Sequence, residues 1–185
     1  MDNRSSDSKK WQILSSEYVL CNPWLTVRKD HVRQPSGVEI PDYWVLEYHD
    51  WINVIAITDT GDPVIERQYR HAMGWISYEI CAGCVEKGED PLAAAQRELL
   101  EETGFGGGSW EKLMVLSPNG TSMNNMCHCF LARGVTRLSD PHQERTEDID
   151  VSLMSEAEVF RLLEDGGFYQ ATMAAPLWRY FVSRL

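Results

Sequence analysis

The sequence lacks several features that would place the protein at or across a membrane. No apolar run approaches the roughly 18 residues that a membrane-spanning helix needs. The first ten residues, MDNRSSDSKK, are polar and contain no apolar stretch of the kind found in secretory signals. We therefore expect no membrane partner, and we expect residues 1–10 to form a disordered tail.

Basic residues are also scarce. The 185 residues include 17 lysines and arginines against 28 aspartates and glutamates, which gives a net charge of -11. Such a charge argues against nucleic acid as a partner, because binding to its phosphate backbone needs lysine and arginine to displace counterions. It is compatible with an anionic small molecule if metal ions mediate the binding.

The chain has five cysteines, an odd number in a protein that is long enough to fold without disulfides. Free thiols in a reducing compartment fit this number best, and we predict a cytoplasmic protein. The pairs Cys81-x-x-Cys84 and Cys127-x-Cys129 could instead bind zinc. However, Cys127 and Cys129 point to one side of a predicted strand and His128 to the other, so buried free thiols are the favoured interpretation.

Short segments rich in β-branched and aromatic residues predict a series of strands. Residues 11–48 are expected to form a small antiparallel sheet, with a turn at QPSG. Residues 51–58 and 63–70 flank DTGD and predict a hairpin, because glycine supplies the turn. The other expected strands, of which the second and third pair with each other, cover residues 75–83, 110–117, 125–132 and 148–155.

Helices separate these strands. Asp90-Pro91 predicts the start of a helix over residues 91–103, and Gly104 predicts its end. A capping box at residues 155–158 predicts a second helix, and a last helix is expected through residues 176–185. The mixture predicts an α/β fold.

Three carboxylates share one face of the helix over residues 91–103. Glu98, Glu101 and Glu102 lie at i, i+3 and i+4, where like charges repel, and lysine partners at i+4 are missing. Hard oxygen ligands at this spacing suit Mg2+ or Mn2+. Taken alone, such a cluster is more often a solvated acidic face. The apolar stripe of the same helix is Leu92, Ala95 and Leu99.

The surrounding residues favour the metal-binding alternative. The chain contains G-x5-E-x7-R-E-φ-x-E-E-x-G-φ, where φ is a bulky apolar residue, with no gap and no mismatch. This pattern resembles the Nudix hydrolases. The matching positions are Gly83, Glu89, Arg97, Glu98, Leu99, Glu101, Glu102, Gly104 and Phe105.

The resemblance implies an α/β/α sandwich that hydrolyses a nucleoside diphosphate linked to a further group, with Mg2+ or Mn2+ as cofactor. It implies metal ligation by Glu98, Glu101, Glu102 and the main-chain carbonyl of Ala82, with Glu101 also assigned to catalysis. It implies a structural ion pair between Glu89 and Arg97. In the later segment QERTEDIDV, Glu147 is expected to be a further metal ligand and Glu144 the general base.

Residues 66–83, ERQYRHAMGWISYEICAG, are similar to the ADP-ribose pyrophosphatase and nucleotide-sugar hydrolase branch of this superfamily. Arg70 is then the first candidate to hold the substrate phosphates and Arg67 a weaker one, although a surface ion pair is an equally good interpretation of Arg70. Trp51 is the candidate to stack on the nucleobase. The branch usually has Leu-Pro-Ala-Gly at the entry to the motif, where this chain has Ile80-Cys81-Ala82-Gly83.

These inferences together predict a tail at residues 1–10, an N-terminal β-sheet subdomain at 11–48 that forms a homodimer, and a Nudix hydrolase domain at 49–185. The predicted activity is metal-dependent hydrolysis of a nucleoside diphosphate sugar such as ADP-ribose. The alternatives are a non-catalytic ligand-sensing module and a pyrophosphohydrolase of other nucleotides.

Overall fold

A computed structural model describes residues 8–183, so residues 1–7 of the predicted tail lie outside the described residues. The chain divides into two compact units. Of the described residues, the first unit contains 8–48 together with Asn119–Asn125, and the second contains His49–Pro118 and 126–183.

The first unit is an antiparallel sheet of the order β1-β2-β3, as predicted. Residue Gly37, with φ 89°, forms the predicted turn between β2 and β3. Residues 119–125 were expected to be a loop of the larger domain, but they bond to this sheet: the Leu46 N–H donates to the Ser122 carbonyl at 2.7 Å. The strands are β1 (Gln12–Cys21), β2 (Thr26–Arg33) and β3 (Glu39–Glu47).

The second unit contains two sheets. The larger has the order β7-β4-β10-β8, with β9 also paired to β10, and β4 and β10 run parallel. The smaller has the order β11-β5-β6 and is antiparallel. The strands are β4 (Trp51–Thr58), β5 (Val64–Arg70), β6 (Trp75–Glu79), β7 (Cys81–Cys84), β8 (Phe105–Gly106), β9 (Ser109–Leu116), β10 (Cys127–Arg137) and β11 (Ile149–Leu153).

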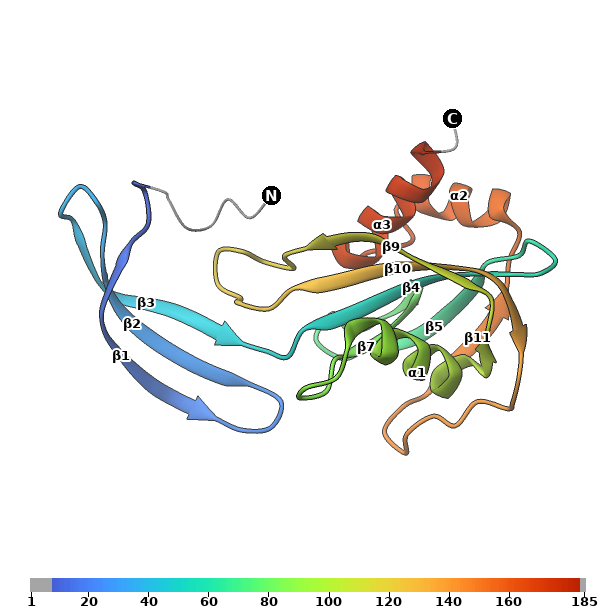
Figure 1. Cartoon of the computed structure of the whole chain (residues 1–185), viewed down its shortest axis with the longest axis horizontal. Helices are drawn as coiled ribbons and strands as arrows, with labels where there is room; N and C mark the ends of the chain where they lie inside the picture. The colour runs from blue at the N-terminus through green and yellow to red at the C-terminus, as the bar shows by residue number, and fades with distance from the viewer. Residues whose placement is uncertain (1–7, 184–185) are drawn as a thin grey trace. The chain divides into compact units, whose positions relative to one another are not determined.

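Helices cover both faces of β4, because its side chains alternate between two cores. Ile52 and Val54 pack in one core with Leu99 of α1 (Pro91–Thr103). Ile55 packs in the other core with residues of α2 (Glu156–Glu164) and α3 (Ala171–Val182). Figure 1 shows α1 on one side of the strands and α2 and α3 on the other. The predicted α/β/α architecture is confirmed.

Two strand predictions are wrong. Residues 51–58 and 63–70 do not form a hairpin: the chain turns at Gly61, but only Ile57 and Pro63 form a bridge, and β4 and β5 then belong to different sheets. Residues 75–83 form two strands rather than one, because pairing changes at Ile80 from β5 to β4. Both errors concern which strand pairs with which, a choice made by distant parts of the chain.

The helix termini follow local chemistry. The Asp90 carboxylate accepts the Leu92 N–H at 2.9 Å, and Gly104 ends α1 with φ 75°. The capping box at residues 155–158 opens α2 as predicted. The last helix begins at Ala171, earlier than predicted, so that Pro176 lies inside it. No helix among residues 8–183 is long and apolar enough to cross a membrane.

Candidate active site

Glu98 projects from α1 onto the backbone of β7. A Cβ atom built on Gly83 would lie only 2.2 Å from the Glu98 Cδ atom, so the side chain occupies the space that glycine leaves open. The Glu98 side chain is 14% exposed, and burial raises its pKa, with a smaller contribution from the charges of Glu101 and Glu147. Glycine at position 83 thus allows a carboxylate to approach the strand.

Arg97 holds the preceding loop to the helix. Its Nε and Nη2 atoms each lie 3.0 Å from an oxygen of Glu89, and Nη2 also donates to the Cys84 carbonyl at 3.2 Å. Its Nη1 atom lies 3.0 Å from both Glu98 and Glu101. The pairing with Glu89 raises the pKa of Arg97 and lowers that of Glu89. One guanidinium therefore fixes three carboxylates.

Glu102 lies one helical turn beyond Glu98 and is buried, whereas the Glu101 side chain is 48% exposed. The Ala82 N–H donates to the Glu102 carboxylate at 3.3 Å, which ties α1 to β7. Burial raises the pKa of Glu102 to about 7, with the charges of Glu98 and Glu147 adding to the effect. This carboxylate is therefore short of positive partners.

The segment between β10 and β11 is fastened to the end of α1. The Gln143 amide donates to the Glu102 carbonyl at 3.2 Å and to the Ile149 carbonyl at 2.8 Å. This places Glu147 near enough to Glu98 and Glu102 for its charge to raise both pKa values. Glu144 is exposed, and its N–H donates to the Glu147 carboxylate at 2.8 Å.

Glu66 also belongs to this group, although no motif in the sequence singled it out. It lies on β5, is only 1% exposed, and approaches Cys81 and Glu102. Burial raises its pKa well above the usual range, and the charge of Glu102 adds to this effect. The alternation of side chains along a strand could have pointed to it, since Glu66 lies four residues before Arg70 and therefore falls on the same face of β5.

Arg70 points to the same face of β5 but is already paired. Its Nε atom donates to the buried carboxylate of Glu79 at 2.8 Å, and its Nη2 atom donates to the other oxygen. Gln170, the N-cap residue of α3, donates to the same carboxylate at 2.8 Å. The charges of Glu102 and Glu66 further raise the Arg70 pKa, so the guanidinium lies near them.

The structure does not bring two of the expected substrate residues to this group. Arg67 is exposed and alternates with Glu66, so it lies on the opposite face of β5, which it shares with Ile65 of the α2–α3 core. Trp51 alternates with Ile52, which packs toward α1, and so it lies on the α3 face of β4. Arg67 was a candidate through the resemblance of residues 66–83 and Trp51 through its position at the start of β4, but the side chains of both point to the opposite face of their strands.

The cysteines do not form the zinc site that was considered. Among the described residues the one metal-compatible group contains Cys81 but not Cys84, Cys127 or Cys129. All five cysteines are free, as predicted, and Cys81, Cys127 and Cys129 are buried. Cys84 is exposed, so burial was wrongly expected for that residue.

Comparison with known proteins identifies the family. Residues 47–175 match the NUDIX domain. The chain belongs to the Nudix family. Residues 11–46, which form the three-stranded sheet, match the nucleoside diphosphate sugar hydrolase N-terminal domain. The resemblance expected from residues 83–105 is therefore confirmed over both parts of the chain.

Similar proteins include two ADP-ribose pyrophosphatases. The one from Mycobacterium tuberculosis is 30% identical over 138 residues, which cover 74% of this chain and 66% of that protein. The one from Bacillus subtilis is 25% identical over 162 residues, which cover 87% of each. The solved structure of an ADP compounds hydrolase has a TM-score of 0.80 at 22% identity and covers 97% of this chain and 96% of that one, which shows a common fold.

Nudix hydrolases use divalent metal ions, and the donor set here fits such an ion. Oxygen atoms of Glu98, Glu102 and Glu147 come from two segments, and their mutual repulsion contributes to the raised pKa values. Hard carboxylate oxygens gathered in this way are the ligands that small divalent cations prefer.

The contact between Gly83 and Glu98 predicts that a substitution at Gly83 weakens metal binding while the protein stays folded. Gly83→Ala should leave the protein folded, because the flexible Glu98 side chain can move away from the new methyl group. That movement displaces a ligand, so Mn2+ binding, followed by electron paramagnetic resonance, should weaken by about tenfold or more.

Gly88→Ala is the matched control, because Gly88 has φ 83° and no atom lies within 4 Å of a Cβ built there. This variant should lose some stability through backbone strain and keep its Mn2+ affinity. Unchanged Mn2+ affinity in Gly83→Ala would contradict the role given to the Glu98 contact.

Proposed function

We propose that the protein hydrolyses the diphosphate linkage of an ADP-ribose-type nucleoside diphosphate sugar to a nucleoside monophosphate and a sugar phosphate. The observation that carries the proposal is the gathering of Glu98, Glu102 and Glu147 around the backbone of β7. The choice of substrate class is supported by the N-terminal sheet and by the names of the similar proteins.

The proposed cofactor is Mg2+ or Mn2+. Glu98, Glu101, Glu102, Glu147 and the Ala82 carbonyl are the residues that would hold it. A bound divalent ion neutralises the diphosphate, lowers the pKa of a water molecule and stabilises the leaving oxygen. This explains how a chain with a net charge of -11 can bind an anionic substrate.

The protein's own residues position these groups. Arg97 orients Glu98 and Glu101 through its Nη1 atom and anchors the loop through Glu89. Glu144 is the proposed general base: it is exposed, and the turn that it forms with Glu147 holds it beside a proposed metal ligand.

Arg70 is the proposed phosphate-binding residue. Glu79 accepts hydrogen bonds from Nε and Nη2, so a phosphate oxygen would be bound through Nη1. The ion pair fixes the plane of the guanidinium, which reduces the entropy lost when substrate binds. Arg67 and Trp51 are left out of the proposed site, because they lie on the opposite faces of their strands.

The activity is tested by incubating the protein with Mg2+ and a panel of ADP-ribose, ADP-glucose, GDP-mannose, UDP-glucose and dinucleotides. We expect release of nucleoside monophosphate and sugar phosphate.

Glu98→Gln and Glu102→Gln should each lower kcat by orders of magnitude and keep the fold, because a neutral amide is a poor ligand. Glu111→Gln, an exposed carboxylate on β9, is the control and should retain full activity.

Hydrolysis of nucleoside triphosphates in preference to the sugar conjugates would refute the substrate class. Binding of a conjugate without turnover would instead support a ligand-sensing module. Near wild-type kcat in Glu102→Gln at saturating Mg2+ would refute the metal assignment.

The assignment of Arg70 predicts a contrast between neighbouring arginines. Arg70→Lys keeps a positive charge beside Glu79 but loses the planar guanidinium, so kcat/KM for ADP-ribose should fall by about tenfold or more with the fold retained. Arg67→Lys should change nothing. Equal kcat/KM values in the two variants would show that Arg70 has only a structural role, as the ion-pair partner of Glu79. Arg70→Ala is a poorer probe, because it leaves a buried carboxylate unpaired.

We further propose that the protein is a cytoplasmic homodimer that binds no nucleic acid and no membrane. The free thiols support the compartment, and the acidic charge opposes nucleic acid. The N-terminal sheet supports the dimer, because nine of the ten residues of β1 are exposed, Tyr18 and Val19 among them. A second copy of the chain would cover this apolar surface.

Light scattering should give twice the 21.2 kDa mass of the chain at micromolar concentration. Val19→Lys should shift the mass toward the monomer, since it places a charge on the apolar sheet. Leu153→Lys changes an exposed leucine of the other unit and should leave the dimer intact. A monomeric wild-type protein would refute the proposal.

A further inference from the structure

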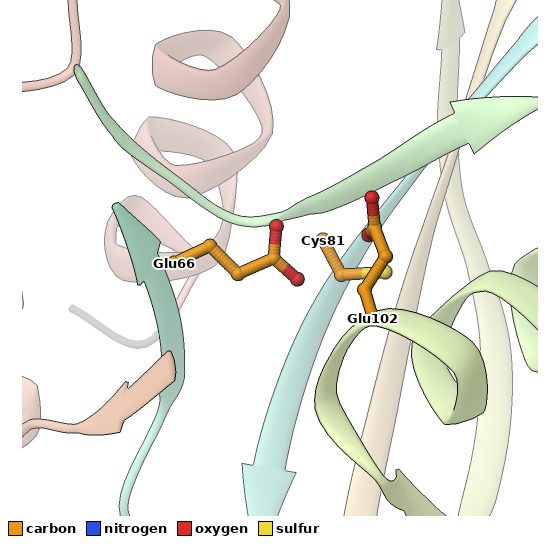
Figure 2. A group of neighbouring side chains, drawn as sticks. All are labelled: Glu66, Cys81 and Glu102. Atoms are coloured by element: carbon orange, nitrogen blue, oxygen red, sulfur yellow. The ribbon is translucent and has the colours of Figure 1, made fainter. Parts of the chain in front are cut away.

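Glu102, one of the proposed metal-binding carboxylates, also forms a second group of metal-binding side chains with Glu66 and Cys81. Glu66 comes from β5, Cys81 from β7 and Glu102 from α1, and one ligand atom of each lies within 4.8 Å of the other two. Figure 2 shows the Glu66 carboxylate directed toward the Cys81 and Glu102 side chains. The group is assembled from three elements that are distant in the sequence.

The Glu66 carboxylate is buried without a hydrogen-bond partner among residues 8–183. The residue is 1% exposed, and neither of its oxygen atoms has a hydrogen-bond partner in the part of the chain that the structure describes. The positive charge of Arg70 acts on Glu66, but the Arg70 guanidinium is already paired with Glu79, so the buried Glu66 carboxylate is short of both donors and positive charge. Its neighbours Cys81 and Glu102 are 1% and 4% exposed, so water does not replace the missing partner at the surface.

We infer that Glu66, Cys81 and Glu102 form a binding site for a borderline transition-metal ion such as Zn2+. A thiolate and two carboxylate oxygens are ligands that Zn2+ accepts, and an ion with bonds of about 2.0–2.3 Å leaves a fourth position for water. Mg2+ avoids sulfur ligands, so Cys81 distinguishes this site from an all-oxygen magnesium site. The ion supplies positive charge beside Glu66 that Arg70, paired with Glu79, provides only in part.

The site goes beyond the proposed hydrolytic function. Glu102 belongs to both ligand sets, whereas Glu66 and Cys81 belong only to the new one. An excess of Mg2+ therefore should not displace the ion, because it cannot replace the bond to sulfur.

Co2+ is the probe, because a cobalt–thiolate bond gives a charge-transfer absorption in the near ultraviolet that carboxylate ligands do not give. The full-length protein is titrated with Co2+ in excess Mg2+, without substrate. We expect one equivalent to bind with this absorption. Cys81→Ser should abolish the band, and Cys84→Ser and Cys129→Ser, which alter an exposed and a buried cysteine outside the group, should keep it.

Glu66→Gln tests the second ligand and keeps the thiol. It should weaken Co2+ binding by about tenfold or more. Absence of the band in the wild-type protein, its persistence in Cys81→Ser, or unchanged affinity in Glu66→Gln would overturn the proposal. Circular dichroism of each variant separates loss of the site from loss of the fold. The readout involves no turnover, so failure of the proposed hydrolytic function would leave this result unaffected.

Discussion

The larger unit depends on one electrostatic constraint: carboxylates are buried between α1 and β7 with little positive charge beside them. Arg97 contacts Glu89, Glu98 and Glu101 on the exposed side of the helix. Glu102 lies deeper, and its pKa of about 7 reflects the cost of charging it there. Folding alone does not relieve this cost, so a bound cation would stabilise the fold as well as enable the chemistry.

Backbone features hold the carboxylates in place despite their repulsion. Gly83 leaves room for Glu98, and Gly104 turns the chain at a point where any Cβ would lie 2.2 Å from the Ser139 carbonyl oxygen. The Ser139 N–H in turn donates to the Gly104 carbonyl at 3.2 Å, which begins the return segment that carries Glu147. A side chain at position 83 would displace Glu98, and a side chain at position 104 would displace the segment that leads to Glu147. Glycine at both positions therefore lets the carboxylates stay close together.

Local chemistry was enough to predict α1 and its charged face, but not the partners of every strand. Asp90 and Gly104 predicted the two ends of α1 because capping depends only on neighbouring residues. The separation of β4 from β5 could not be predicted in this way, because it depends on β10 and β11, which lie far along the chain. Which face of β5 points to α1 depends in the same way on distant residues, and it places Arg67, the weaker candidate, on the face opposite to Arg70.

At the proposed second site, Cys81 is a small change in the motif that would alter metal preference within an unchanged fold. The strand β7 lies at the edge of its sheet, where proline is tolerated because fewer ladder hydrogen bonds are needed. Proline here would offer no ligand atom, whereas cysteine at the same backbone position places sulfur beside Glu102. Glu66 then adds a carboxylate from a strand outside the motif. Together the two residues extend an all-oxygen donor set with sulfur, and sulfur favours softer ions than magnesium. On this proposal, the metal preference of the chain depends on residues 66 and 81 as well as on the carboxylates of the helix.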